Sequence, residues 1–116
     1  MIYDILKPYG FEKAVVKDGT KIHRWNKFES INPPVKDKSK VDGIAAYVSK
    51  DEDDIIIVIA CDAGYFSDME NILADKFVSD LKTAYDFNLQ QGLVMKGQVH
   101  FLLRSNGFGN IAGLDI

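Results

Sequence analysis

A chain of 116 residues, 47% of them hydrophobic, has the size of one compact domain and enough apolar material for a core. The net charge of -3 argues against a general nucleic-acid-binding domain, which is more often strongly basic. No run reaches the roughly 18 apolar residues of a membrane span, and a lone cysteine excludes an internal disulfide. The amino end shows no signal-peptide pattern, so we expect a cytoplasmic single domain over residues 1–116.

The first third of the chain predicts a short helix, a β-hairpin and a loop. Apolar residues at helical spacing indicate a helix over residues 1–7, which a proline then ends. Residues 11–17 and 20–27 are strand-like and flank Asp18-Gly19, a pair suited to a type I′ turn. Residues 30–40 contain two prolines and several polar residues, so we expect an exposed loop.

Two further strands follow this loop, and the second is predicted to be interior. Residues 41–49 form the third strand, and the carboxylates of residues 51–54 mark the turn into the fourth, residues 55–61. The fourth strand opens with six consecutive apolar residues, so neither of its faces can be exposed to water. We therefore expect this strand to be covered on both sides.

A long amphipathic helix is predicted over residues 67–87. Ser67 and Glu70 form a capping box at its start, in which each side chain satisfies a backbone N–H group. Apolar residues then recur on one helical face, which predicts that this face packs on a sheet. The residues expected in that contact are Met69, Leu73, Phe77 and Leu81.

Strands at residues 92–96 and 98–104 complete the predicted order, and residues 105–116 form a glycine-rich tail of the same domain. A crossover that contains a helix is what parallel strands require, so the fourth strand is expected to pair in parallel with a strand after the helix. The expected fold class is α/β, with α+β as the alternative. It combines a mixed sheet, a short N-terminal helix, an N-terminal β-hairpin and one long helix packed on the sheet.

A strand that contains Asp42, VDGIAAYV, is followed by the strand IIIVIACD, by a helix that ends LKTAYDF, and by GLVMKGQVHFLL. In this order of elements, residues 1–104 resemble the PD-(D/E)XK nuclease superfamily, in the arrangement of the amino-terminal domains of restriction-enzyme motor subunits. The resemblance implies a metal-dependent nuclease scaffold. The positions that match the family's acid and lysine are Ala60 and Asp62, and no glutamine precedes Tyr85 in the helix, so the catalytic motif is degenerate.

The resemblance leaves Asp42 and Asp62 as a possible vestigial metal site, because such nucleases hold a hard divalent cation between carboxylates. The lysine that assists the attacking water in this family is missing, so we expect no catalytic residue and no cofactor. If a cofactor were bound, the resemblance implies that it would be Mg²⁺. The carboxylates of residues 51–54 are interpreted as a solvated turn, and Cys61 as a small buried hydrophobe. One cysteine and two separated histidines do not have the spacing of a zinc site.

Positive charge is concentrated early in the chain. Residues 12–40 carry eight Lys/Arg against four acidic side chains, whereas residues 41–90 carry three against eleven. Within residues 20–40, cationic side chains accompany aromatic ones, which suits an anionic partner, either nucleic acid or an acidic protein face. The other interpretation is a solvated surface with Trp25 capping the core. The candidate partner-binding residues are Lys21, Arg24, Trp25, Lys27, Phe28, Lys36, Lys38 and Lys40.

Two functions remain open from the sequence. The leading one is a non-enzymatic binding or accessory protein on a degenerate nuclease-like scaffold, with a virus or mobile element as a candidate source. The alternative is a metal-dependent nuclease with a rearranged active site. The sequence indicates no membrane partner, and it leaves open whether the chain is a monomer or a homodimer.

Overall fold

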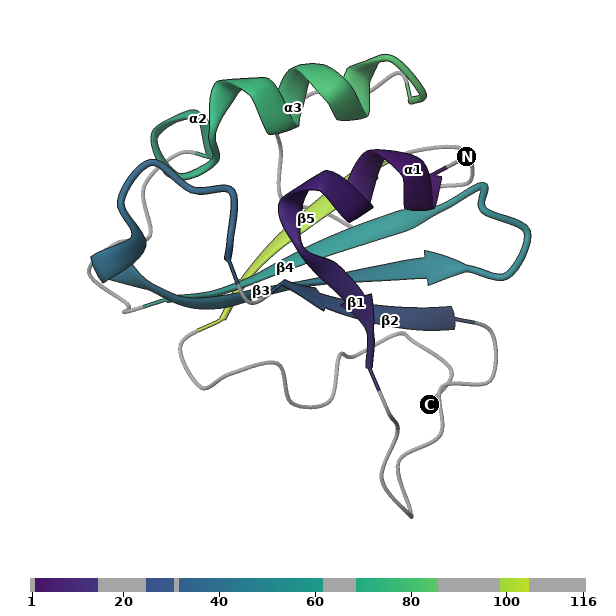
Figure 1. The fold of residues 1–116 in the computed structure, drawn as a ribbon, viewed down its shortest axis with the longest axis horizontal. Helices are drawn as coiled ribbons and strands as arrows, with labels where there is room; N and C mark the ends of the chain where they lie inside the picture. Colours follow the sequence, from purple (N-terminus) through teal and green to yellow (C-terminus); the bar gives the residue numbers. More distant parts are fainter. Residues whose placement is uncertain (1, 15–24, 31, 62–68, 86–98, 105–116) are drawn as a thin grey trace.

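The described residues form a five-stranded mixed sheet with helices on one face (Figure 1). The computed structural model describes residues 2–14, 25–30, 32–61, 69–85 and 99–104. These residues form a small α/β domain, as the sequence predicts. The elements are α1 (Ile2–Leu6), η1 (Lys7–Tyr9), β1 (Phe11–Lys13), β2 (Trp25–Ser30), η2 (Lys38–Lys40), β3 (Val41–Ser49), β4 (Ile55–Cys61), α2 (Met69–Ile72), α3 (Asp75–Lys82) and β5 (Val99–Arg104), where η marks a 3₁₀-helix.

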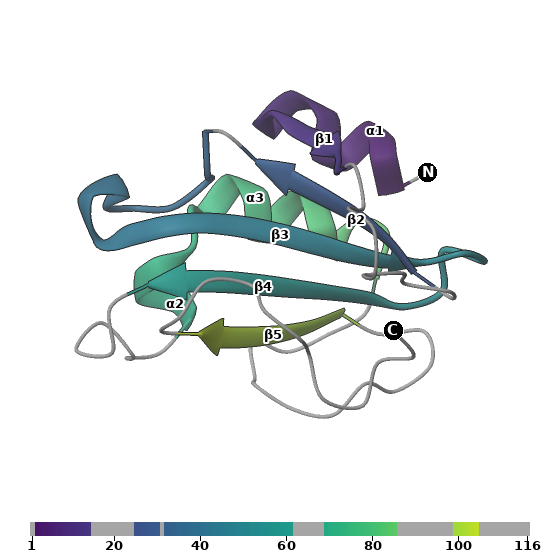
Figure 2. The same ribbon diagram turned by 90° about the horizontal axis from the view of Figure 1, so that it is seen from below.

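The strands lie in the sheet in the order in which they occur in the chain (Figure 2). Strands β1 to β4 pair in antiparallel fashion, each with the next. Strand β5 runs parallel to β4, with Ile55 opposite Val99 and Ala60 opposite Arg104. The parallel pairing expected from the helical crossover is therefore confirmed, and it makes the sheet mixed.

Strand β4 is interior and fully buried, as its run of β-branched residues predicts. Alternate residues of a strand face opposite sides of the sheet, so β4 contributes to two apolar clusters. Ile55, Ile57, Ile59 and Cys61 belong to the inner cluster, which we define as the buried apolar residues between the sheet and the helices. The outer cluster, on the opposite face, consists of Ala45, Tyr47, Ile56 and Val58.

The inner cluster is filled from above by α1, η1 and α3. Phe77 and Leu81 of α3 are fully buried, and the Phe77 ring stacks on Phe11 with centroids 5.8 Å apart. Helix α1 and η1 end at Gly10, whose φ of 77° is favourable for glycine because it lacks a Cβ atom. The predicted helix at the amino end is therefore present, with 3₁₀ geometry in its last turn.

The predicted single helix over residues 67–87 is wrong, because the structure contains two shorter helices there. The backbone between α2 and α3 is extended at Ala74, with ψ of 135°. Leu73, Phe77 and Leu81 are buried as expected. Ser67, residues 86–87 and the side chains of Met69 and Glu70 are not among what the structure describes, so the cap of Ser67 and Glu70 stays a prediction.

The loop before β3 explains the interruption between α2 and α3. The Ala74 N–H donates to the Pro34 carbonyl at 2.8 Å, and the Lys36 N–H donates to the Ile72 carbonyl at 2.9 Å. Val35 and Leu73 form an isolated antiparallel bridge between these two bonds. Backbone groups that would continue a helix are therefore used by the loop. The prediction that residues 30–40 are exposed is also wrong for this part, since Pro34 and Val35 are buried.

The predicted hairpin is present as the β1–β2 pair, but within the described residues its second strand continues to Ser30, and its register differs from the expected one. Lys13 is opposite Phe28, whereas a two-residue turn at Asp18-Gly19 would place Phe28 opposite Tyr9. The predicted turn, the strand at residues 92–96 and the tail at residues 105–116 fall outside the described residues. Among the helices that the structure describes, none is long and apolar enough to cross a membrane.

Candidate partner-binding surface

Asp42 lies in a bulge at the start of β3. Val41 is opposite Cys61 and Gly43 is opposite Ala60, so Asp42 is the extra residue, and its side chain is exposed. Asp62 lies outside the described residues, so the closeness of the two carboxyl groups stays a prediction. Cys61 is fully buried in the inner cluster, as expected of a small hydrophobe. In the described ranges no three His, Cys, Asp or Glu residues are grouped to hold a metal ion.

The turn between β3 and β4 is closed by its own hydrogen bonds. The Ser49 N–H donates to the Asp54 carbonyl at 3.0 Å, and the Glu52 N–H donates to the Ser49 carbonyl at 2.8 Å. The Ser49 hydroxyl donates to Asp51 Oδ1 at 2.7 Å, and the same carboxylate oxygen accepts from the Asp53 N–H. Asp51 therefore shapes this acidic turn, which we define as residues 49–54.

Tyr85 ties the chain after α3 to the acidic turn. Its hydroxyl donates to the Glu52 carbonyl at 2.9 Å. Glu52 itself has a left-handed φ of 60°, which is unfavourable for a residue with a Cβ atom. Burial raises the pKa of Tyr85 to about 12, and the carboxylates of Glu52, Asp53 and Asp54 act in the same direction. The tyrosine hydroxyl therefore remains a hydrogen-bond donor at any physiological pH.

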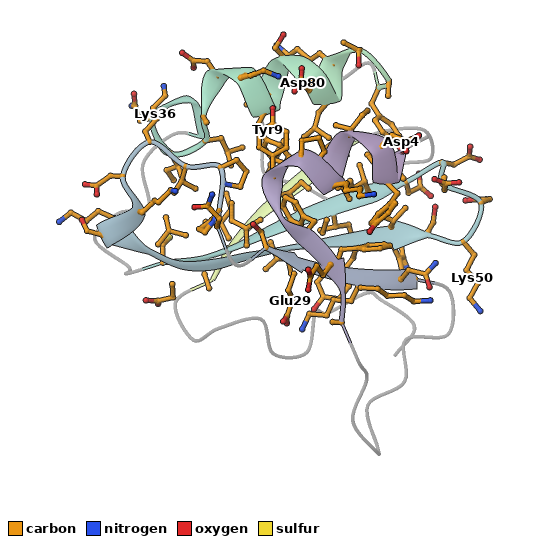
Figure 3. The ribbon with its side chains drawn as sticks, in the orientation of Figure 1. Asp4, Tyr9, Glu29, Lys36, Lys50 and Asp80 are labelled. Atoms are coloured by element: carbon orange, nitrogen blue, oxygen red, sulfur yellow. The ribbon has the colours of Figure 1, made fainter. Side chains whose placement is uncertain are left out.

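A second polar cluster joins η1 to α3 on the helical side (Figure 3). The Tyr9 hydroxyl donates to Asp80 Oδ2, and Lys76 Nζ donates to the same oxygen at 2.9 Å. These two hydrogen bonds lower the pKa of Asp80, and the bond from Tyr9 has the larger effect. The pKa of Tyr9 is raised, mainly by burial and to a smaller extent by Asp80. The sequence gives no sign of this cluster, because Tyr9 and Asp80 are 71 positions apart.

The hairpin residues of the predicted partner surface lie on both faces of the sheet. Trp25 and Lys27 are opposite Ser49 and Tyr47, so they lie on the outer face, where Trp25 packs against the outer cluster. Lys27 Nζ lies 5.7 Å from the centre of the Tyr47 ring and 2.8 Å from Glu29 Oε1. Figure 3 shows Glu29 pointing away from the helices. Lys27 is therefore already engaged by groups of the sheet itself.

Phe28 faces the other way and belongs to the packing of the helical side. It contacts the inner cluster, and its ring centre lies 5.5 Å from that of Tyr3. Trp25 and Phe28 thus do not form a joint aromatic platform. Lys21 and Arg24 lie outside the described residues, so their role stays a prediction.

The three remaining candidates are presented together by the lysine loop, which we define as residues 32–40. Lys36, Lys38 and Lys40 are exposed. Lys36 Nζ lies 3.3 Å from Asp75 Oδ1 at the start of α3, and Lys38 Nζ donates to Asn32 Oδ1.

Asp37 fixes the conformation of η2, which carries Lys38 and Lys40. Its Oδ1 accepts hydrogen bonds from the Ser39 hydroxyl at 2.6 Å and the Ser39 N–H at 3.1 Å. These bonds lower the pKa of Asp37, the hydroxyl having the larger effect. The carboxylate of Asp37 is therefore directed to the backbone of its own loop.

The lysine loop and the acidic turn lie at opposite ends of β3. Val41 and Ser49 are the first and last of nine residues, so eight steps with a rise of about 3.3 Å each separate them by roughly 26 Å. Lys36 and Lys50 accordingly lie at opposite ends of Figure 3. Because Trp25 is opposite Ser49, the structure does not bring Trp25 together with the three loop lysines.

Searches for related proteins find no protein-family model, no curated protein and no solved structure that matches this chain.

Proposed function

We propose that this chain is a non-enzymatic binding or accessory protein that contacts an anionic partner, nucleic acid or an acidic protein face, through residues 20–40. The observation that carries the proposal is the presentation of three exposed lysines from one anchored loop. Attraction between opposite charges favours both the encounter and its orientation. We assign the main contact to the lysine loop, because Trp25 and Phe28 pack against the domain itself.

The anchoring of the lysine loop supports this assignment. Two backbone hydrogen bonds and the Val35–Leu73 bridge fix the first half of the loop to the joint between α2 and α3, and Asp37 fixes the second half. A loop that is already ordered loses less conformational entropy when a partner binds. The lysine side chains can thus engage a partner without rearrangement of the backbone that carries them.

Neutralisation of the loop tests the proposal. The variant carries Lys36→Gln, Lys38→Gln and Lys40→Gln, and its binding to an immobilised glutamate-rich peptide or thymidine oligonucleotide is measured at low salt. We expect the affinity to fall about tenfold or more, since each exposed charge contributes about 1 kcal/mol or less to binding. The matched control neutralises exposed lysines elsewhere, with Lys7→Gln, Lys50→Gln and Lys82→Gln, and should retain binding. Equal losses in the two variants, or no response to added salt, would refute the proposal.

The nuclease alternative needs its own assay. The purified protein is incubated with DNA and Mg²⁺, and products are compared for the unmodified chain and for Asp42→Ala. Cleavage that Asp42→Ala abolishes would replace the binding proposal with a metal-dependent enzyme, because it would show that this carboxylate takes part in the reaction.

A further inference from the structure

The carboxylates around the lysine loop indicate which anionic partner it fits, an inference that rests on the function proposed above. We infer that the partner is an acidic segment of another protein. In the absence of that partner, Asp75 occupies the position on Lys36 that a carboxylate of the partner would take. Lys36 Nζ lies 3.3 Å from Asp75 Oδ1, so a carboxylate already binds this ammonium group.

The distribution of charge around the loop is mixed rather than uniformly positive. Asp37 lies between two of the lysines, Asp42 follows the third by two residues, and Asp75 lies against Lys36. A nucleic acid presents closely and regularly spaced phosphates, which would meet these aspartates as well as the lysines. An acidic protein segment can place carboxylates opposite lysines and neutral groups opposite aspartates. The mixed pattern therefore favours a protein partner.

The side-chain types of the loop point in the same direction. Residues 32–40 contain no arginine, whose guanidinium would bind phosphate through paired hydrogen bonds, and no aromatic ring on which a base could stack. Trp25 pairs with the far end of β3, and Phe28 contacts the inner cluster. Lysine ammonium groups bind a carboxylate through charge and N–H donation and need no paired geometry, so the loop provides what an acidic segment needs.

The contact between Lys36 and Asp75 is well placed to exchange for a partner's carboxylate. The side chains are 42% and 92% exposed, and ion pairs of this kind contribute at most about 1 kcal/mol. The backbone bonds from Pro34 and Lys36 to the α2–α3 joint keep the two residues adjacent. Asp75 therefore acts as an internal competitor that weakens binding without closing the site.

Direct binding by the purified full chain tests both parts of the inference. The probes are a fluorescent glutamate-rich peptide and a thymidine oligonucleotide of equal net charge, titrated at low salt by fluorescence anisotropy. We expect the peptide to bind more tightly, and Asp75→Asn to tighten its binding by about two- to fivefold, the range of an exposed ion pair. Asp53→Asn removes the same charge at the far end of β3 and should leave the affinity nearly unchanged.

Each outcome separates the two levels of the proposal. Tighter binding of the oligonucleotide, lost in the variant with the three loop lysines replaced, would overturn the choice of a protein segment and leave the proposed function standing. Equal effects of Asp75→Asn and Asp53→Asn would overturn the competitor role of Asp75. If replacing the three loop lysines changes neither affinity, the proposed function itself fails, and with it this inference. Circular dichroism of each variant verifies that the fold is retained.

Discussion

Replacement of Phe77 by alanine should remove more stability than any other single truncation in α3. The ring is fully buried, stacks on Phe11 at 5.8 Å and receives the Tyr9 ring edge-on at 5.0 Å. Truncation of a buried phenylalanine costs about 3–5 kcal/mol, from the lost burial and the cavity that remains. A domain of this size has a free energy of unfolding of about 5–15 kcal/mol, so the variant loses a large share of its stability.

Urea denaturation followed by circular dichroism measures this loss. With a denaturant dependence of about 2 kcal/mol/M, the expected change lowers the midpoint by roughly 2 M. Tyr3→Ala is the control, because Tyr3 is 40% exposed, and its loss should cost less than about 1 kcal/mol. A midpoint shift for Phe77→Ala no larger than that for Tyr3→Ala would refute the placement of Phe77 at the centre of the inner cluster.

Two further predictions concern the acidic turn. Tyr85→Phe should lower the free energy of unfolding by about 1 kcal/mol at neutral pH, through loss of the hydrogen bond to Glu52. The pKa of Tyr85 is raised from 10.0 to about 12 in the folded state. The stability difference between the unmodified protein and Tyr85→Phe is therefore complete below pH 10 and is lost as the pH rises towards 12. Denaturation curves that show a constant difference across this range would contradict the prediction. Glu52→Gly should have a higher melting temperature than Glu52→Ala. Both variants lack the carboxylate, but only glycine adopts the left-handed φ without strain, a difference of about 1 kcal/mol in the free energy of unfolding. Equal melting temperatures would argue against strain at this residue.

The sequence predicts the sheet well where the information is local. The run from Ile55 to Ala60 has no polar residue, so an interior strand is the arrangement that leaves none of it in water. Strand β3 and the turn at residues 51–54 follow from the same alternation of apolar and charged stretches. These elements needed no knowledge of the rest of the chain.

The errors arise where distant segments decide the local structure. No glycine or proline marks the break at Ala74, which results from bonds to Pro34 and Lys36 about forty positions earlier. The register of β2 follows from its pairing with β3, where Phe28 is opposite Ala46, and not from the Asp18-Gly19 signal. Local propensity is a weak guide when tertiary contacts compete for the same backbone groups.

The candidate surface shows the same limit. Exposure of Lys36, Lys38 and Lys40 follows from their charge, and the sequence predicts it. Their separation from Trp25, however, depends on the pairing of β2 with β3, and the contact between Lys36 and Asp75 depends on the α2–α3 joint. Proximity in sequence placed these residues on one surface, whereas the sheet distributes them over two faces and two ends.

The parallel pairing of β4 with β5 also has a kinetic consequence. Strands β3 and β4 are joined by a short turn, so their ends meet after closure of a small loop. Strand β5 must instead find β4 across the interval from residue 61 to residue 99, and the entropy lost in closing a loop grows with its length. Non-local strand pairing of this kind is slow, so we expect β5 to join last. Helices α2 and α3 lie within that interval, so we expect their packing on the sheet to shorten the free chain that closes when β5 pairs with β4.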